Sequence, residues 1–163
     1  MDKTHIYCMP GLGANPAIFE NISLPEDRFE LHFLEWKIPL SIEETLEEYA
    51  IRMSKDIIHK SPVLLGVSFG GILMQEVSKI IPFKKIILIS TIKSHHEFPN
   101  RLKLIQRTKA YRFFPTKIVE NLDHYTKYFL GDFLKKRAEL YKMYLSVKDA
   151  LYMKWAIFNL LHW

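Results

Sequence analysis

The chain has 163 residues and a net charge of +5, and 48% of its residues are hydrophobic and 25% charged. This balance excludes an intrinsically disordered chain, and no apolar run is long enough to predict a membrane span. The charge is uneven, with −3 on residues 1–91 and +8 on residues 92–163. The single cysteine, Cys8, excludes an internal disulfide. Since no secretory signal pattern is found either, we expect a cytoplasmic protein.

Short apolar runs alternate with helical patterns in the first half of the chain. The first helix is expected to begin at a capping box of Ser41 and Glu44. Such alternation predicts an α/β fold of three layers, in which helices cover a mainly parallel sheet of about four strands. In chain order we expect strands at 5–9 and 29–36, a helix at 42–57, a strand at 62–67, a helix at 71–81 and a strand at 85–90.

Residues 92–163 differ from this pattern. They are basic, aromatic and helical in spacing, with no comparable strand run. We therefore divide the chain into an α/β core at 1–91 and a helical, cap-like segment at 92–163.

The sequence Gly66-Val67-Ser68-Phe69-Gly70 stands between a predicted buried strand and a predicted helix. A G-x-S-x-G in this position is typical of a nucleophile elbow, a sharp turn that holds the serine hydroxyl clear of the sheet. Gly66 and Gly70 are expected to relieve crowding of the backbone at this turn. The alternative is a glycine-rich turn in which the serine caps the helix. We predict that Ser68 is a nucleophile.

A second glycine-rich loop, Pro10-Gly11-Leu12-Gly13, follows the first predicted strand. Acyl transfer needs two amide donors that face the developing oxyanion. We expect these donors to be the amides of Leu12 and Phe69, with Gly11 and Gly13 holding the loop open. A dinucleotide-binding fingerprint is excluded because its third glycine is replaced by Pro16. We expect no cofactor and no metal.

These two motifs, in this order, resemble the α/β-hydrolase superfamily, and most closely its small intracellular bacterial members. The resemblance covers residues 4–91. It implies that the four strands lie in the order second, first, third, fourth, and that the segment after Thr91 is a cap over the active site. It also implies a triad in the order Ser, Asp or Glu, His.

No residue of the chain is an obvious triad acid or base. His5, His32 and His59 precede the serine and are expected to be structural, and Cys8 lies within a strand. The remaining candidates, His95-His96 beside Glu97, Asp123-His124 and the penultimate His162, are each expected to be poorly placed for the role. We therefore expect the last strands and the triad acid and histidine to be missing, and the chain to be truncated and nearly inactive.

The sequence thus predicts a serine hydrolase that acts on an ester or similar acyl bond of a small-molecule substrate. The alternative is an inactive, hydrolase-like binding module that uses its pocket or its basic helical half. Neither nucleic-acid binding nor stable membrane insertion is expected. A weaker possibility is that the helical segment 101–117 lies on a membrane surface, because it mixes apolar and basic residues. The oligomeric state and the substrate stay open.

Overall fold

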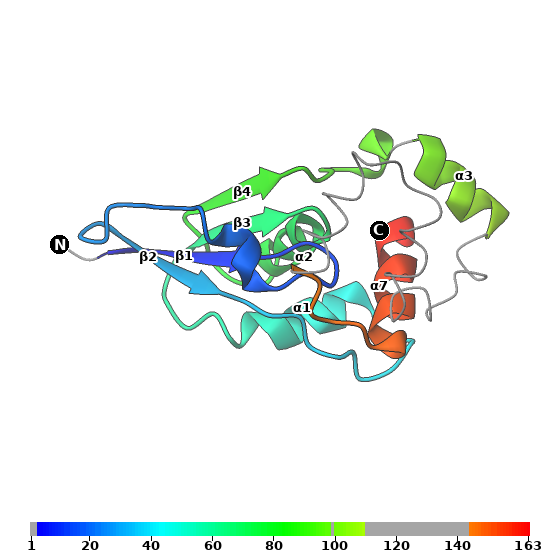
Figure 1. Ribbon diagram of the computed structural model, residues 1–163, viewed down its shortest axis with the longest axis horizontal. Helices are drawn as coiled ribbons and strands as arrows, with labels where there is room; N and C mark the ends of the chain where they lie inside the picture. The colour runs from blue at the N-terminus through cyan, green and yellow to red at the C-terminus, as the bar shows by residue number, and fades with distance from the viewer. Residues whose placement is uncertain (1–2, 99, 110–143) are drawn as a thin grey trace.

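Four parallel strands form one sheet, which lies in the left half of the view in Figure 1. The computed structural model describes residues 3–98, 100–109 and 144–163. The sheet order is β2-β1-β3-β4, which confirms the predicted order. The second strand is shorter than predicted, since its pairing with β1 ends at Phe33. The strands are β1 (Thr4–Met9), β2 (Phe29–Phe33), β3 (Val63–Val67) and β4 (Lys85–Ile89).

Two helices, α1 (Leu46–Ser54) and α2 (Phe69–Ser78), cover one face of the sheet. Their apolar residues pack with Tyr7, Met9 and Leu64, which point to this face. On the other face, Ile6, Cys8, Val63 and Leu65 pack against Phe19 of the 3-10 helix η1 (Pro16–Phe19). The described part of the chain therefore places the larger core between the sheet and the two α-helices.

The first helix begins four residues later than the sequence predicted. The capping box is formed by Thr45 and Glu48, in which each side chain bonds the other residue's backbone amide. Glu44 has a different role, because its buried carboxylate accepts bonds from Arg52 and from the amide of Leu40. The predicted capping box at Ser41 was wrong because the chain carries the same S/T-x-x-E pattern twice in succession.

The last helix, α7 (Ala150–His162), belongs to the same core cluster as α1 and α2. Trp155 is fully buried, and its indole nitrogen donates to the carbonyl of Glu44 at 2.6 Å. The indole of Trp163 donates to the Glu76 carboxylate. The helix thus continues through His162, and Trp163 docks its end against α2.

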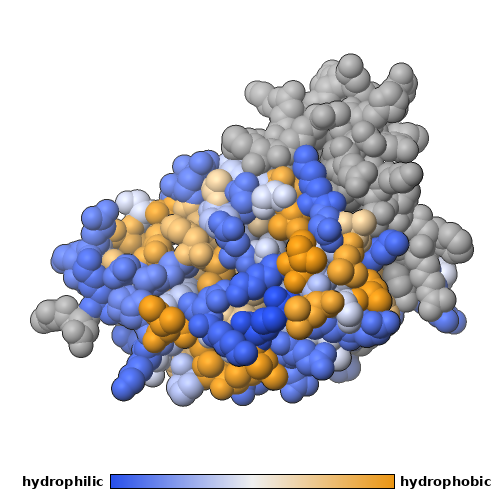
Figure 2. Space-filling view, turned by 90° about the horizontal axis from the view of Figure 1, so that it is seen from below, coloured by the Kyte–Doolittle hydropathy of each residue, from blue (hydrophilic) through white to orange (hydrophobic). Residues whose placement is uncertain are grey.

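Between β4 and α7 the structure describes two further short elements, η2 (His95–Glu97) and α3 (Asn100–Thr108). Helix α3 contacts α7. Residues 110–117 of the proposed membrane-surface segment lie outside the described residues. Among the helices that the structure describes, none has the length and apolarity that crossing a bilayer requires. Figure 2 shows hydrophobic and hydrophilic residues intermixed on one face of the molecule.

Cys8 should be chemically inert in the folded chain. Its side chain is fully buried, and burial raises the pKa of the thiol to about 12. Because the thiolate is the reactive form, we expect Ellman's reagent to modify Cys8 very slowly in buffer and rapidly in denaturing urea. Absorbance at 412 nm follows the reaction, and rapid modification of the native chain would contradict the buried position.

Candidate active site

Ser68 lies at a sharp turn between β3 and α2. Its φ of 53° and ψ of −122° fall in a region that residues other than glycine rarely adopt. The side chain is exposed and forms no capping hydrogen bond with α2, although Ser68 is the N-cap residue of that helix. A serine that only capped the helix would bond an amide of the first turn. The hydroxyl is therefore held clear of the helix, in the geometry of a nucleophile elbow.

The two elbow glycines stand where no larger residue fits. A β-carbon on Gly66 would lie 2.5 Å from the carbonyl oxygen of Gly70. A β-carbon on Gly70 would lie 2.2 Å from the carbonyl oxygen of Pro10. The short distance at Gly70 shows that the start of α2 lies close against the backbone at the end of β1. The glycines thus permit both the tight turn and the close approach of the elbow to the Pro-Gly loop.

The Pro-Gly loop lies beside Ser68, the predicted nucleophile. A β-carbon on Gly11 would be 3.7 Å from the β-carbon of Ser68. The amide of Gly13 donates to the hydroxyl of Tyr152, and that of Ala14 donates to the carbonyl of Gly11. Of the amides at positions 12–14, these two are already used, so Leu12 is the remaining donor candidate.

The amide of Phe69 is the second candidate donor. It is the first amide of α2, so it has no partner within the helix. The positive end of the helix dipole lies here as well, which favours a developing negative charge. The Phe69 side chain is fully buried and anchors this amide in the core.

Trp36 fixes the loop and the elbow relative to each other. Its indole nitrogen donates to the carbonyl of Gly11 at 2.7 Å, and its ring stacks on Phe69 with centroids 5.2 Å apart. Nothing in the local sequence predicts this role, because Trp36 was expected to be the last residue of the second strand. Since β2 ends at Phe33, Trp36 instead lies after the strand, near the carboxyl edge of the sheet.

The segment before α7 pairs with the Pro-Gly loop from the other side. Gly13 has a φ of 66°, and its carbonyl accepts from the amides of Ser146 and Val147. Asn15 donates its amide to the carbonyl of Tyr144 at 2.7 Å. A β-carbon on Gly13 would meet the side chain of Leu145 at 3.0 Å. The loop is therefore held by residues more than 120 positions later in the sequence.

Tyr152 should contribute to stability through its bond to the loop. Its hydroxyl is buried and accepts the Gly13 amide at 3.0 Å, and burial raises the pKa of Tyr152 well above its usual range. Tyr152→Phe leaves that amide without a partner, so we expect the free energy of unfolding to fall by about 1–3 kcal/mol. Urea unfolding followed by circular dichroism measures the change. Tyr144→Phe is the control, because that exposed hydroxyl donates to the Glu20 carboxylate and its loss should lower the free energy of unfolding by less than about 0.5 kcal/mol. Equal losses of unfolding free energy in the two variants would contradict a stabilising role of the Tyr152–Gly13 hydrogen bond.

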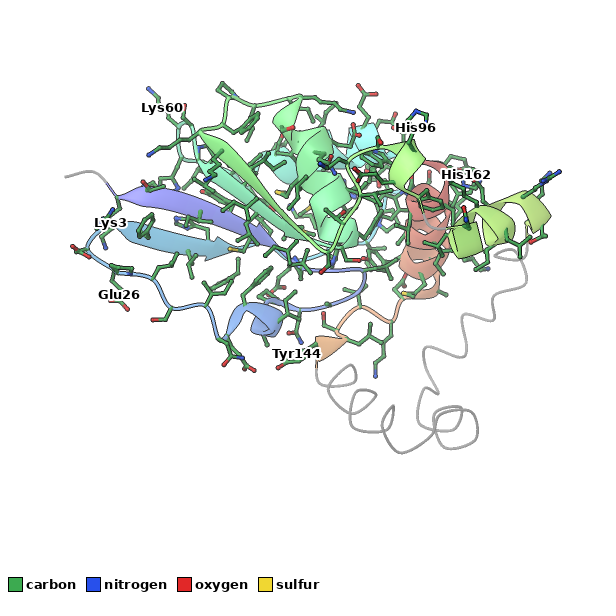
Figure 3. All side chains as sticks on the ribbon, turned by 90° about the horizontal axis from the view of Figure 1, so that it is seen from above. Lys3, Glu26, Lys60, His96, Tyr144 and His162 are labelled. Atoms are coloured by element: carbon green, nitrogen blue, oxygen red, sulfur yellow. The ribbon has the colours of Figure 1, made fainter. Side chains whose placement is uncertain are left out.

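Among the histidines whose side chains the structure describes, none is hydrogen-bonded to Ser68. His96 is exposed, and Glu97 beside it accepts the backbone amide of Lys93. His162 is also exposed, stacks on Phe158 and lies with Nδ1 2.8 Å from the Phe158 carbonyl. Asp123 and His124 lie outside the described residues. Figure 3 shows His96 and His162 at the end of the molecule where the strands end.

Comparison with known proteins identifies the fold. No protein-family model and no curated protein matches the chain. Solved structures do match over 98% of the chain. They include a carboxylesterase structure of the thaumarchaeon Nitrososphaera gargenis (16% identity, TM-score 0.64) and MenH from S. aureus (13%, 0.55). A third is BioG from Haemophilus influenzae (16%, 0.50). The chain spans 64%, 66% and 68% of these three structures, respectively. With its sheet order, this similarity shows that the chain has the α/β-hydrolase fold.

Proposed function

We propose that the chain is the nucleophile-bearing part of a serine hydrolase that acts on an ester or similar acyl bond. The observation that carries the proposal is the left-handed backbone of Ser68, which presents an exposed hydroxyl beside the Pro-Gly loop. A strained conformation of this kind persists only where the surrounding structure enforces it, and such sites cluster at functional positions. The likeness of the fold to a carboxylesterase agrees with this chemistry.

The proposed reaction has two steps. The Ser68 oxygen attacks the carbonyl carbon of the substrate while a base takes the hydroxyl proton, and the carbonyl oxygen becomes an oxyanion that the amides of Leu12 and Phe69 stabilise. The intermediate collapses, the alcohol leaves with a proton, and an acyl-Ser68 remains. Water then attacks the acyl group in the same way and releases the acid.

None of the side chains that the structure describes places a general base at Ser68. Without a base, a serine hydroxyl is a weak nucleophile at neutral pH. We therefore expect the chain alone to turn over p-nitrophenyl acetate hardly faster than buffer. Imidazole added to the solution can replace an absent histidine if the hydroxyl and the oxyanion donors are in place, because the exposed side chain is open to solvent.

The experiment measures acylation with p-nitrophenyl acetate as a function of imidazole concentration, after subtraction of the reaction of imidazole alone. We expect an additional, saturable rate and an acetyl group in the tryptic peptide 61–79, located on Ser68 by fragmentation. Ser68→Ala should abolish both. Ser23→Ala, an exposed serine in the loop before β2, is the matched control and should change neither.

Two results would count against the proposal. Acylation that survives Ser68→Ala would place the nucleophile elsewhere. No Ser68-dependent acylation at any imidazole concentration, from a chain that is folded by circular dichroism, would favour the alternative of a hydrolase-like binding module.

A further inference from the structure

Three histidines from distant parts of the sequence meet on one face of the sheet. His5 lies on β1, His32 on β2 and His59 in the loop between α1 and β3. Each offers one ring nitrogen, and these three nitrogens all lie within 4.8 Å of one another. Nδ1 of His5 and Nε2 of His32 are hydrogen-bonded at 2.9 Å. The fold thus brings together three imidazole rings that were each expected from the sequence to be structural.

The backbone explains the convergence. In the β1–β2 register, Tyr7 is opposite His32 and His5 is opposite Glu30. His5 and Tyr7 are two residues apart on one strand, so they share a face of the sheet. His59 reaches the same face because its Nδ1 lies 2.7 Å from the Tyr7 hydroxyl, which also accepts the amide of Ile58. The positions are therefore set by regular strand pairing and two hydrogen bonds.

The spacing of the nitrogens suits a transition-metal ion. Two imidazole nitrogens bound to one tetrahedral Zn²⁺ at 2.0–2.1 Å would be about 3.3 Å apart. The distance between Nδ1 of His5 and Nε2 of His32 needs to increase by only a few tenths of an ångström. The rings of His5 and His59 are stacked at 3.5 Å, so one of them must turn for both lone pairs to reach the same ion. A bound ion would replace this stack and the His5–His32 hydrogen bond.

The surroundings supply charge, support and access. The Glu30 carboxylate lies 3.6 Å from Nδ1 of His5 and 3.9 Å from Nε2 of His32, where its charge would offset that of a cation. The Tyr7 hydroxyl can orient His59, as partners of ligating histidines do in metal proteins. His5 and His32 retain 24% and 23% of their side-chain exposure, and His32 and Tyr7 border an open groove along β2. An ion can therefore enter from solvent.

We propose that His5, His32 and His59 form a binding site for a divalent transition-metal ion such as Zn²⁺, for which three histidines and an open fourth position are a known ligand set. The neutral imidazole is the form that binds a metal ion.

Two of the three histidines, His5 and His59, lie toward the end of the sheet opposite to Ser68. His5 is near the beginning of β1 and His59 precedes β3, whereas the elbow follows the end of β3. Figure 3 shows Lys3 and Lys60, close in sequence to two of the histidines, at the end of the molecule away from His96 and His162. The ion would thus join β1, β2 and the loop before β3, which is a structural role that does not depend on the proposed hydrolase activity.

The test is calorimetric titration of the untagged chain with ZnCl₂, preceded by dialysis against EDTA. We expect one ion per chain, a rise of the melting temperature with Zn²⁺ but not with Mg²⁺, and the same affinity for Ser68→Ala. His5→Gln and His59→Gln should each weaken binding tenfold or more. His96→Gln is the control, since this exposed histidine lies outside the cluster.

A second measurement avoids the variants, in case they unfold. Nitrogen NMR of the imidazole rings in the wild-type chain should show one ring nitrogen of each of the three histidines shifting on addition of one equivalent of Zn²⁺. The proposal is overturned if no one-to-one binding occurs, if His96→Gln weakens binding as much as the cluster variants, or if the shifted nitrogens belong to other histidines.

Discussion

Gly70→Ala is expected to destabilise the chain by about 3 kcal/mol or more, a large fraction of the 5–15 kcal/mol that holds a typical domain folded. The added methyl group would stand 2.2 Å from the carbonyl oxygen of Pro10 and 2.5 Å from that of Met9. Both are backbone atoms at the end of β1, so they cannot turn away as a flexible side chain would. Either α2 or the Pro-Gly loop must move. The measurement is the urea midpoint of the variant against wild type.

Gly11→Ala is the control for this prediction. Its β-carbon would make ordinary contacts at 3.7 and 3.8 Å, and Gly11 does not have a positive φ. We expect a change in the free energy of unfolding below about 1 kcal/mol. If Gly70→Ala were as stable as Gly11→Ala, the close approach of the elbow to the end of β1 would be wrong.

Trp155→Ala is expected to cost about 3–5 kcal/mol, the usual range for removal of a large buried aromatic residue. Trp155 is fully buried, and its ring centroid lies 4.4 Å from that of Tyr49 and 6.1 Å from those of Phe69 and Tyr152. Removal leaves a cavity between α7, α1 and α2 and takes the indole donor from the carbonyl of Glu44. Urea unfolding followed by far-ultraviolet circular dichroism measures the loss without relying on tryptophan emission.

The matched control lies on the same helix. Phe158 is 44% exposed, so Phe158→Ala removes an aromatic ring of α7 without opening a core cavity, and we expect a loss below about 1 kcal/mol. A small effect of Trp155→Ala would mean that α7 is not packed into the core. Because α7 also carries Tyr152, the Pro-Gly loop would then lose its support.

Local patterns were enough to predict the turn at Ser68, whereas the order of the strands followed from the resemblance to the α/β-hydrolase superfamily. A buried strand, two glycines and a helix fix the turn at Ser68 by sterics that act within five residues. The start of α1 could not be predicted in the same way. Ser41 and Thr45 each precede a glutamate by three residues, and only the burial of Glu44 against Arg52 shows which of the two begins the helix.

The supports of the site depend on contacts between distant residues. Tyr152 meets Gly13 across 139 positions and Trp36 meets Gly11 across 25. Nothing in the local sequence distinguishes these aromatic residues from others of the core. The same is true of the histidine cluster, since only the strand register brings His32 opposite Tyr7. Of the +8 on residues 92–163, +3 falls on residues 110–143, which lie outside the described residues.

The most direct test of the central claim is a crystal structure of the chain after reaction with diethyl p-nitrophenyl phosphate in the presence of imidazole. We predict a phosphoryl group on Ser68, with its unesterified oxygen about 3 Å from the amide nitrogens of both Leu12 and Phe69. An adduct on another serine, or an oxygen on Ser68 that faces away from these two amides, would contradict the assignment.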